Sequence, residues 1–339
     1  MSRICLYYRT PPENDRWLPG DRFLRPSIRH LIRGRPRLGG LDKVFTNLCL
    51  GLDRLGVPYF VNLPFRELNK DDRVGVLGRG RYALKEYDRE NPIVAGIGLM
   101  THPSEWPSLC EDYPIAFYLQ HSEWASEIYR PFFKEKCRVW PVGIDTHAWQ
   151  PSEKRVKRFD FLIYDKILWD REEQAHQLLE PIKNELSRRG LSFIQLQYGC
   201  YDEHQYREAL ASCGAMIFLC EHESQGLAYQ ECLATDVPVL AWDQGHYLDP
   251  NMLAWGQPVT PATSVPYFDE RCGLRFRDIQ EFSSTLTRFL NLQSQGAFAP
   301  RVYVIENLTL EKSAGHFLQL LDDAQRASAI HTSDAAARL

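Results

Sequence analysis

The sequence of 339 residues lacks the long apolar runs and the cysteine patterns that mark membrane-spanning or disulfide-stapled proteins. No stretch approaches the roughly 18 consecutive apolar residues of a membrane-spanning helix. The nine cysteines are odd in number, and none has a Cys-x-x-Cys spacing or a zinc-ligand spacing with histidine. Several lie inside apolar runs, where a thiol behaves as a small hydrophobic group. We therefore expect reduced thiols in a cytoplasmic protein, and no metal site.

The sequence also lacks an excess of charge of either sign. It contains 40 Lys and Arg residues and 44 Asp and Glu residues, which gives a formal net charge of −4. This near balance argues against general electrostatic binding of nucleic acid. Apolar residues make up 44% of the chain, as in an ordinary globular protein. At about 150 residues per domain, the length favours two domains.

The first half of the chain alternates short apolar runs with a helical pattern. The apolar positions 41, 44, 45, 48, 52 and 55 fall on one helical face, and Gly56 ends the pattern. Around it, short apolar runs predict strands at 4–8, 57–63, 74–77, 93–99 and 115–119. Strands that alternate with helices in this way predict a parallel sheet.

A polar linker at 150–158 is followed by a second alternation of the same kind. Strands are predicted at 159–164, 191–196, 215–220 and 237–242, with helices at 172–189, 204–212 and 226–234. A last helix at 309–321 is expected to pack back on the first domain. We predict an α/β protein with two Rossmann-like domains, 1–150 and 151–321, facing each other across a cleft, and a tail at 322–339. Such sheets bind ligands at the carboxyl ends of their strands.

The segment from Leu219 to Trp242 contains the densest chemical signal. Glu223 lies in a polar loop after an apolar strand, Gly226 opens a helix, and Glu231 lies two turns along it. A glycine lets the backbone approach a ligand closely, and a helix N-terminus suits a phosphate. A carboxylate before the helix can bind sugar hydroxyls, and one within it can bind a ribose diol. The alternative is a capped helix with one exposed glutamate.

This Glu-x7-Glu spacing, followed by an apolar helix and Val-Pro-Val, resembles the signature of the retaining GT-B glycosyltransferases, notably glycosyltransferase family four (group 1). The sequence departs from that signature at Gln225, where the family has Phe, and at Asp236, where it has Gly. The matching residues are Glu223, Gly226, Glu231, Ala234, Pro238 and Val239.

Further segments resemble the same family in the same order. The segment 139–151 is similar to the family's motif at the domain junction. The segment 165–171 is similar to Gly-Arg-Leu-x3-Lys, with Lys166 in the Arg place, Arg171 in the Lys place and Asp165 in the Gly place. In the first half, Gly39-Gly40 resembles the family's N-terminal Gly-Gly loop, and His121 matches a histidine that follows a strand.

The resemblance implies a retaining, metal-independent glycosyltransferase of the hexosyltransferase type, with a UDP- or GDP-type sugar donor and no cofactor. Glu231 would hold the ribose, Glu223 the transferred sugar, and Lys166 with Arg171 the diphosphate. Gly39, Gly40 and His121 would complete the cleft from the first domain. The implied catalytic residues are Glu223, His121, Lys166 and Arg171, and the implied donor-binding residues are Gly39, Gly40, Lys166, Arg171, Glu223, Ser224, Gln225, Gly226, Leu227 and Glu231.

An arginine-rich stretch from Arg22 to Arg37 is a local basic cluster with interspersed apolar residues. Such a face can contact anionic lipid or a phosphorylated acceptor, although a solvated face is the alternative. By analogy with the family, we expect a glycan or lipid-linked glycan as acceptor, in polysaccharide biosynthesis at the inner face of the membrane. No nucleic acid partner is expected.

Two other function classes fit the same fold. A nucleotide-sugar epimerase would need acid–base groups at a sugar carbon. A non-catalytic nucleotide-sugar-binding homologue would be consistent with the departures at Asp165, Gln225 and Asp236. A nicotinamide dehydrogenase is disfavoured, because no Gly-x-Gly-x-x-Gly opens either half.

Overall fold

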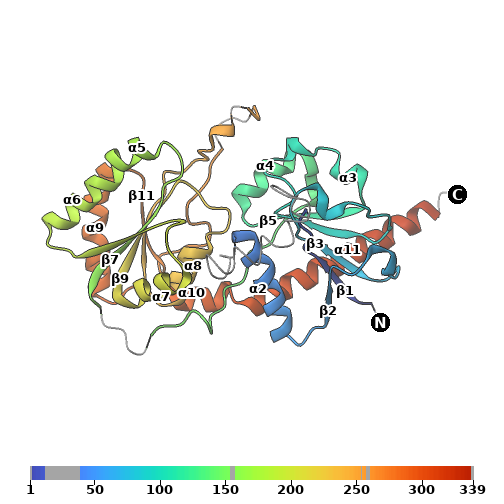
Figure 1. The fold of residues 1–339 in the computed structure, drawn as a ribbon, viewed down its shortest axis with the longest axis horizontal. Coiled ribbons are helices and arrows are strands. Elements are labelled where there is room, and N and C mark those ends of the chain that lie inside the picture. The colour runs from blue at the N-terminus through green and yellow to red at the C-terminus, as the bar shows by residue number, and fades with distance from the viewer. Residues whose placement is uncertain (1, 12–38, 153–156, 253, 257–259, 337–339) are drawn as a thin grey trace, which may run out of the picture. The chain divides into compact units, whose positions relative to one another are not determined.

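The computed structural model describes residues 2–11, 39–152, 157–252, 254–256 and 260–336. The chain forms two compact units (Figure 1). Unit 1 consists of Met1–Leu119, Phe132–Arg138 and Gly315–Leu339, and unit 2 of Gln120–Pro131 and Val139–Ala314. Each unit has its own β-sheet with flanking helices, which confirms the predicted α/β class.

The sheet of unit 1 has six strands in the order β2-β1-β3-β4-β5-β6, and β1 to β5 are parallel to one another. Its strands are β1 (Ile4–Tyr7), β2 (Tyr59–Val61), β3 (Arg73–Val76), β4 (Ile93–Gly96), β5 (Ile115–Gln120) and β6 (Cys137–Val139). The helical segments along this part of the chain are α2 (Gly40–Arg54), η1 (Phe65–Glu67), η2 (Arg81–Leu84), η3 (Pro103–Glu105), α3 (Leu109–Asp112), α4 (Glu123–Phe133) and η4 (Lys134–Lys136).

Helix α2 coincides with the predicted helical face and begins at a glycine. Gly39 is its N-cap, and the Gly39 N–H donates to Asp42 Oδ2 over 2.8 Å. Asp42 also accepts a 2.6 Å hydrogen bond from the Tyr8 hydroxyl and two 3.1 Å hydrogen bonds from Arg79. One carboxylate therefore joins the start of α2 to the segments that follow β1 and β3.

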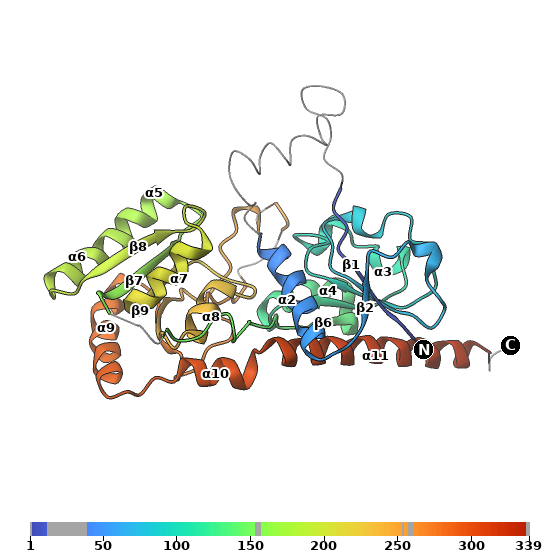
Figure 2. The ribbon, with the colours of Figure 1, turned by 60° about the horizontal axis from the view of Figure 1, so that its bottom comes forward.

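Helix α11 (Leu310–Ala336) is one uninterrupted helix, red in Figure 2, and it corrects the predicted tail. The sequence pattern predicted that this helix ends at residue 321, but contacts hold the following residues within unit 1. Asp322 forms a 2.7 Å ion pair with Arg73, and Gln325 donates to the Asp72 carbonyl over 3.1 Å. Ala324 is buried, so the short side chains of this stretch still contribute a packed face.

The predicted boundary at residue 150 also differs from the observed division. The chain leaves unit 1 after Leu119, returns to it for Phe132–Arg138, and returns again at Gly315. Such crossings are set by tertiary contacts, whereas the polar composition of 150–158 marks only a place where few residues are buried. His121 consequently belongs to unit 2 and not to the first domain.

The sheet of unit 2 has five parallel strands in the order β11-β10-β9-β7-β8. Its strands are β7 (Phe159–Lys166), β8 (Phe193–Gln197), β9 (Cys213–Cys220), β10 (Val239–Trp242) and β11 (Gly273–Phe276). The helical segments are α5 (Arg171–Gln174), the π-helical η5 (Ala175–Leu179), α6 (Glu180–Arg188), α7 (Glu203–Ser212), α8 (Leu227–Ala234), η6 (Pro250–Met252), α9 (Ile279–Ser294) and α10 (Pro300–Asn307).

Successive residues of the central strands of unit 2 point into two different cores, as the pleat of a strand requires. Ile163 of β7 lies in the core that α6 and α9 cover, together with Ile182 and Phe289. Its neighbour Tyr164 lies in the core that α7, α8 and α10 cover, together with Tyr206. Figure 1 shows these two helix layers on opposite faces of the sheet. The central strands β7, β9 and β10 are buried on both faces, so polar side chains can gather at the carboxyl edge of the sheet.

Two expectations from the sequence concern the membrane. The basic cluster Arg22–Arg37 lies outside the described residues. Within the described part of the chain, no helix is long and apolar enough to cross a membrane.

Candidate functional site

Lys166 and Glu223 lie side by side at the carboxyl edge of the unit 2 sheet. Lys166 is the last residue of β7 and pairs in register with Cys220, the last residue of β9. Glu223 follows in the next loop, and its Oε1 forms an ion pair with Lys166 Nζ. The two side chains are 16% and 14% exposed, so the pair is largely shielded from water but still reachable.

The surroundings of Lys166 keep its ammonium group charged. Burial alone would lower the pKa of Lys166, but the adjacent Glu223 carboxylate outweighs this effect and raises the pKa above its ordinary value. Lys166 Nζ also lies 4.8 Å from the centre of the Tyr198 ring, a cation–π geometry that favours the charged form. The predicted role of Lys166, to hold the donor diphosphate, stays a prediction.

Arg171, the second predicted cation, is the first residue of α5 and is directed at another carboxylate. Its two terminal nitrogens donate to the two oxygens of Asp165 over 2.9 and 2.6 Å, and Nη1 also donates to the Ile167 carbonyl over 3.0 Å. Asp165 is fully buried and accepts a further 2.8 Å hydrogen bond from Gln195. The residue in the place of the family's glycine thus provides the countercharge of Arg171.

Gly226 and Glu231 belong to α8 as the sequence predicted. Gly226 has φ +80°, a left-handed conformation, and a Cβ at this position would overlap the ring of Tyr229. Glu231 is buried within α8, whereas Ser224 and Leu227 are half-buried at the start of the helix. The backbone requirement for glycine at position 226 is therefore both conformational and steric.

Gln225 is buried and joins the Glu223 loop to the 139–151 segment. Its Oε1 accepts a 2.8 Å hydrogen bond from the Val142 N–H, and its Nε2 donates to the Val142 carbonyl over 3.3 Å. The same Nε2 donates to Gln230 Oε1 over 2.7 Å. The glutamine in the place of the family's Phe therefore binds both main-chain polar groups of one residue, Val142.

His121 is a buried residue of unit 2. Its Nδ1 lies 3.3 Å from the Trp140 carbonyl, and its own carbonyl accepts a hydrogen bond from the Tyr267 hydroxyl. Burial lowers the pKa of His121 to about 4, although the hydrogen bond to Trp140 opposes this shift. The ring is therefore neutral near pH 7. Trp124, in the first turn of α4, donates from Nε1 to the Glu223 carbonyl over 3.0 Å.

An aromatic cluster beside Glu223 was missed by the sequence analysis. His222 is stacked on Trp169 with ring centres 5.1 Å apart, and it also contacts Tyr247 at 4.4 Å and Trp124 at 5.4 Å. Burial lowers the pKa of His222 to about 4. The sequence offered two signals for this cluster. One is the aromatic content of 12%, and the other is that Trp169 and His222 lie within the segments 165–171 and 219–242.

Gly39 and Gly40 belong to unit 1 and lie at the start of α2. Gly39 has an extended backbone, and a Cβ on Gly40 would meet nothing within 4 Å. Gly40 therefore does not require a glycine in this conformation, in contrast to Gly226, whereas a Cβ on Gly39 would lie 3.0 Å from Asp42 Oδ2 and 3.2 Å from Arg79 Nη2. Their predicted role beside the donor stays a prediction.

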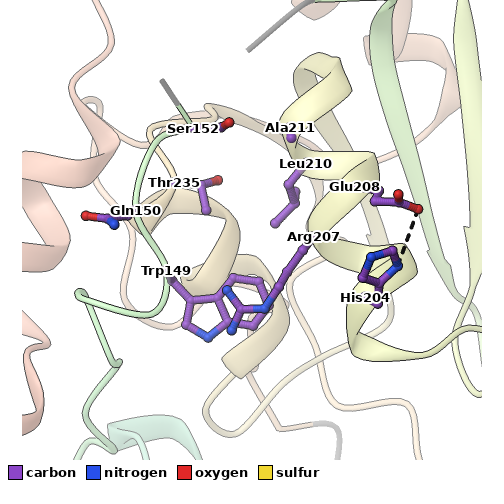
Figure 3. A pocket seen from close by; sticks show the side chains of 9 residues that line it. All are labelled: Trp149, Gln150, Ser152, His204, Arg207, Glu208, Leu210, Ala211 and Thr235. Carbon is purple, nitrogen blue, oxygen red and sulfur yellow. Dashed lines mark ion pairs between the residues drawn. The ribbon is translucent and has the colours of Figure 1, made fainter. Parts of the chain in front are cut away.

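A pocket of about 290 Å³ in unit 2 lies away from these residues, along α7 (Figure 3). Its charged groups are already paired with one another. Arg207 Nη2 lies 2.8 Å from Glu203, and its guanidinium carbon is 3.7 Å from the centre of the Trp149 ring. His204 lies 3.5 Å from Glu208. The lining therefore offers few free groups for recognition of a ligand.

The part of the chain that the structure describes contains no candidate metal site. No group of three or more His, Cys, Asp or Glu side chains is arranged to hold a metal ion there.

The fold is similar to that of several solved glycosyltransferases. No known protein family matches the sequence, and no curated protein matches it either. AviGT4, a glycosyltransferase involved in avilamycin A biosynthesis, has a TM-score of 0.55 and 13% identity, over 96% of this chain and 98% of that chain. WaaB, a lipopolysaccharide outer core galactosyltransferase, has a TM-score of 0.54 and 10% identity, over 96% of this chain and 99% of that chain.

A third neighbour was solved with ligands. A mutant of S. aureus TarM in complex with fondaparinux, alpha-GlcNAc-glycerol and UDP has a TM-score of 0.54 and 12% identity, over 82% of this chain and 58% of that chain. At these identities the likeness concerns the fold alone. The two parallel sheets with their helix layers therefore give this chain the GT-B fold of the neighbouring glycosyltransferases.

Proposed function

We propose that the protein is a glycosyltransferase that moves a sugar from a nucleotide-diphospho-sugar to an acceptor hydroxyl. The observation that supports it best is the Lys166–Glu223 ion pair at the carboxyl edge of the unit 2 sheet. Open α/β sheets bind ligands at this edge. The GT-B fold of the neighbours adds support, and one of them contains UDP.

Donor binding would rearrange the Lys166–Glu223 pair. Lys166 would exchange the carboxylate for an oxygen of the donor diphosphate, and Glu223 would then accept hydrogen bonds from hydroxyls of the transferred sugar. Arg171 would contribute less than the sequence suggests, because Asp165 and the Ile167 carbonyl already occupy its guanidinium group. Glu231 would hold the ribose, with the backbone of residues 224–227 alongside the donor.

Catalysis would come mainly from electrostatic stabilisation of the leaving diphosphate by Lys166. The neutral ring of His121 can exchange a hydrogen bond with the sugar without adding charge to the site. We further propose that the reaction retains the anomeric configuration and needs no metal. Gly39 and Gly40 would take part from unit 1.

The acceptor is proposed to be a glycan or lipid-linked glycan. The Arg22–Arg37 segment would contact an anionic membrane surface in that case. The donor base is proposed to be uridine or guanosine.

The decisive test is sugar transfer by wild type, Lys166→Met and the matched control Lys183→Met. Lys183 pairs with Glu180 on the surface of α6 and is not part of the proposed site. UDP-, GDP- and ADP-sugars would first be screened by thermal shift. With the stabilising donor, Lys166→Met should lower kcat/KM by about 100-fold or more, the magnitude typical of a lost electrostatic contact to the transition state.

Two outcomes would reject the proposal. One is unchanged transfer by Lys166→Met. The other is interconversion of the donor in the absence of any acceptor, which would identify an epimerase.

A further inference from the structure

The loop 167–170, which joins β7 to α5, is short and conformationally strained. Asp170 has φ +44°, a left-handed conformation that is unfavourable for a residue other than glycine. Asp170 is also the N-cap of α5, yet its side chain caps no N–H of the helix. Strained backbone of this kind persists only where the surrounding contacts hold it in place.

Glu221 holds this loop from the neighbouring strand end. Lys166 pairs in register with Cys220, so Glu221 comes directly after the paired residues and faces the loop. Glu221 Oε1 accepts hydrogen bonds from the Leu168 N–H over 2.8 Å and from the Trp169 N–H over 3.0 Å. Two consecutive backbone donors thus converge on one carboxylate oxygen.

The environment makes these two hydrogen bonds hard to replace. Glu221 is only 2% exposed, so water has little access to its carboxylate, whereas the side chain of the loop residue Leu168 is 48% exposed. Its own carbonyl accepts a 3.1 Å hydrogen bond from Gln244 Nε2, which fixes the main chain from which the carboxylate projects. Leaving buried backbone donors without an acceptor is costly.

The aromatic cluster supports the same loop from a second direction. Trp169 is stacked on His222, the residue that follows Glu221, with an interplanar angle of 29°. Backbone and side chain of Trp169 are therefore both held by consecutive residues of the loop after β9. Lys166 immediately precedes this restrained loop.

We propose that Glu221 is a positioning residue that fixes the loop 167–170, and with it Lys166, in the geometry that receives the donor diphosphate. The part of this inference that concerns the donor rests on the proposed function. The part that concerns the loop rests on the hydrogen bonds alone. Glu221 itself touches no reacting atom in this arrangement.

Three variants of the full chain separate positioning from general stability. Glu221→Leu keeps a similar volume and removes both acceptor bonds. Glu221→Gln has nearly the same size and keeps an acceptor oxygen for the two loop amides. Glu185→Leu is the control, because Glu185 pairs with Arg188 and Arg189 on α6 and makes no contact with this loop.

Amide hydrogen exchange tests the loop without reference to activity. In the wild type, the amides of Leu168 and Trp169 should be protected. In Glu221→Leu they should exchange about tenfold faster, the effect of losing one hydrogen bond, whereas Glu221→Gln and Glu185→Leu should behave as the wild type. Unprotected amides in the wild type would overturn the inference even if Glu221→Leu fails to fold. Unchanged exchange in a folded Glu221→Leu would overturn it as well.

Steady-state kinetics with the stabilising donor tests the consequence for Lys166. Glu221→Leu should raise the donor KM about tenfold with a smaller change in kcat, and Glu221→Gln should restore KM to near the wild-type value. Glu185→Leu should leave KM unchanged. A wild-type KM in Glu221→Leu, or a Gln variant as impaired as the Leu variant, would overturn the donor part. If the wild type binds no nucleotide sugar, the proposed function fails, and the exchange experiment still decides the role of Glu221 in the loop.

Discussion

Each unit has a carboxyl group that accepts hydrogen bonds from the backbone, one amide in unit 1 and two in unit 2, but the pKa values of the two groups are shifted in opposite directions. In unit 1, Asp42 accepts from the Gly39 N–H and is 31% exposed; burial opposes its ionisation, yet hydrogen bonds from Tyr8 and Gly39 and the Arg79 charge lower its pKa. In unit 2, Glu221 accepts from two loop amides and is 2% exposed, and burial raises its pKa.

The difference shows that burial, more than the number of hydrogen bonds, decides how strongly such a contact constrains its surroundings. Water can replace Asp42 at the start of α2, because the helix end is partly open to solvent. Water has little access to the Glu221 carboxylate, which is 2% exposed. We therefore expect the edge of unit 2 to be the less tolerant of substitution.

The largest expected effect concerns glycine at the two helix starts. Gly226→Ala should destabilise the protein by about 3 kcal/mol or more, because its φ is +80° and its Cβ would overlap the ring of Tyr229. Gly40→Ala is the matched change in unit 1, where the added Cβ meets nothing within 4 Å, and should stay within about 0.5 kcal/mol. Urea unfolding measures both free energies. Equal effects of the two substitutions would contradict the contrast between the units.

The second prediction concerns acid sensitivity. Burial lowers the pKa of His121 from 6.5 to about 4, so the folded protein disfavours the protonated ring. The stabilisation is present above pH 6.5 and is lost as the pH falls towards 4, by up to about 3 kcal/mol. The free energy of unfolding at pH 7 and pH 4.5 should therefore change less in His121→Gln than in the wild type. His147→Gln, at an exposed residue, is the control and should retain the wild-type dependence.

The smallest expected effect concerns backbone strain after α8. Asp236 has φ +62°, where the resembling family has glycine. Asp236→Gly should relieve the strain but increase the entropy of the unfolded chain, so a net stabilisation of no more than about 1 kcal/mol is expected. In unit 1, Asn62 also has a positive φ of 54°, but Asn62→Gly loses the hydrogen bond that Asn62 Oδ1 accepts from the Tyr8 N–H. Thermal unfolding should show no gain in stability for Asn62→Gly, and a gain above about 1 kcal/mol for Asp236→Gly would contradict the prediction.

Local sequence patterns were sufficient to predict the parallel sheets and the elements that carry the site. The apolar run at 159–164 and the spacing from Glu223 to Glu231 located β7 and α8, because strand and helix periodicities are local properties. The pairing of Arg171 with Asp165 and the capture of loop amides by Glu221 were not predictable in this way. The first depends on the path of the loop 167–170. The second depends on which strand ends become neighbours, and Lys166 meets Cys220 only in the folded sheet.

The full length of helix α11 was not predicted, for a related reason. Residues beyond 321 are rich in short and polar side chains, so no apolar stripe announces that Ala324 is buried. The assignment of His121 to unit 2 likewise depends on contacts with Trp140 and Tyr267, which lie far along the chain.

The position of α11 in unit 1 has a consequence for biosynthesis. Phe317 is fully buried, and its ring would collide with a Cβ on Gly75 of β3, so the last helix fills a space beside one of the first strands. Unit 2 ends at Ala314 and can fold on the ribosome once that residue has emerged. Unit 1, although its strands are synthesised first, has to wait for the synthesis of α11 before its core is closed. A nascent chain that stops at residue 314 would therefore present an intact second unit beside a first one with an open apolar face, which is the condition under which chaperones bind.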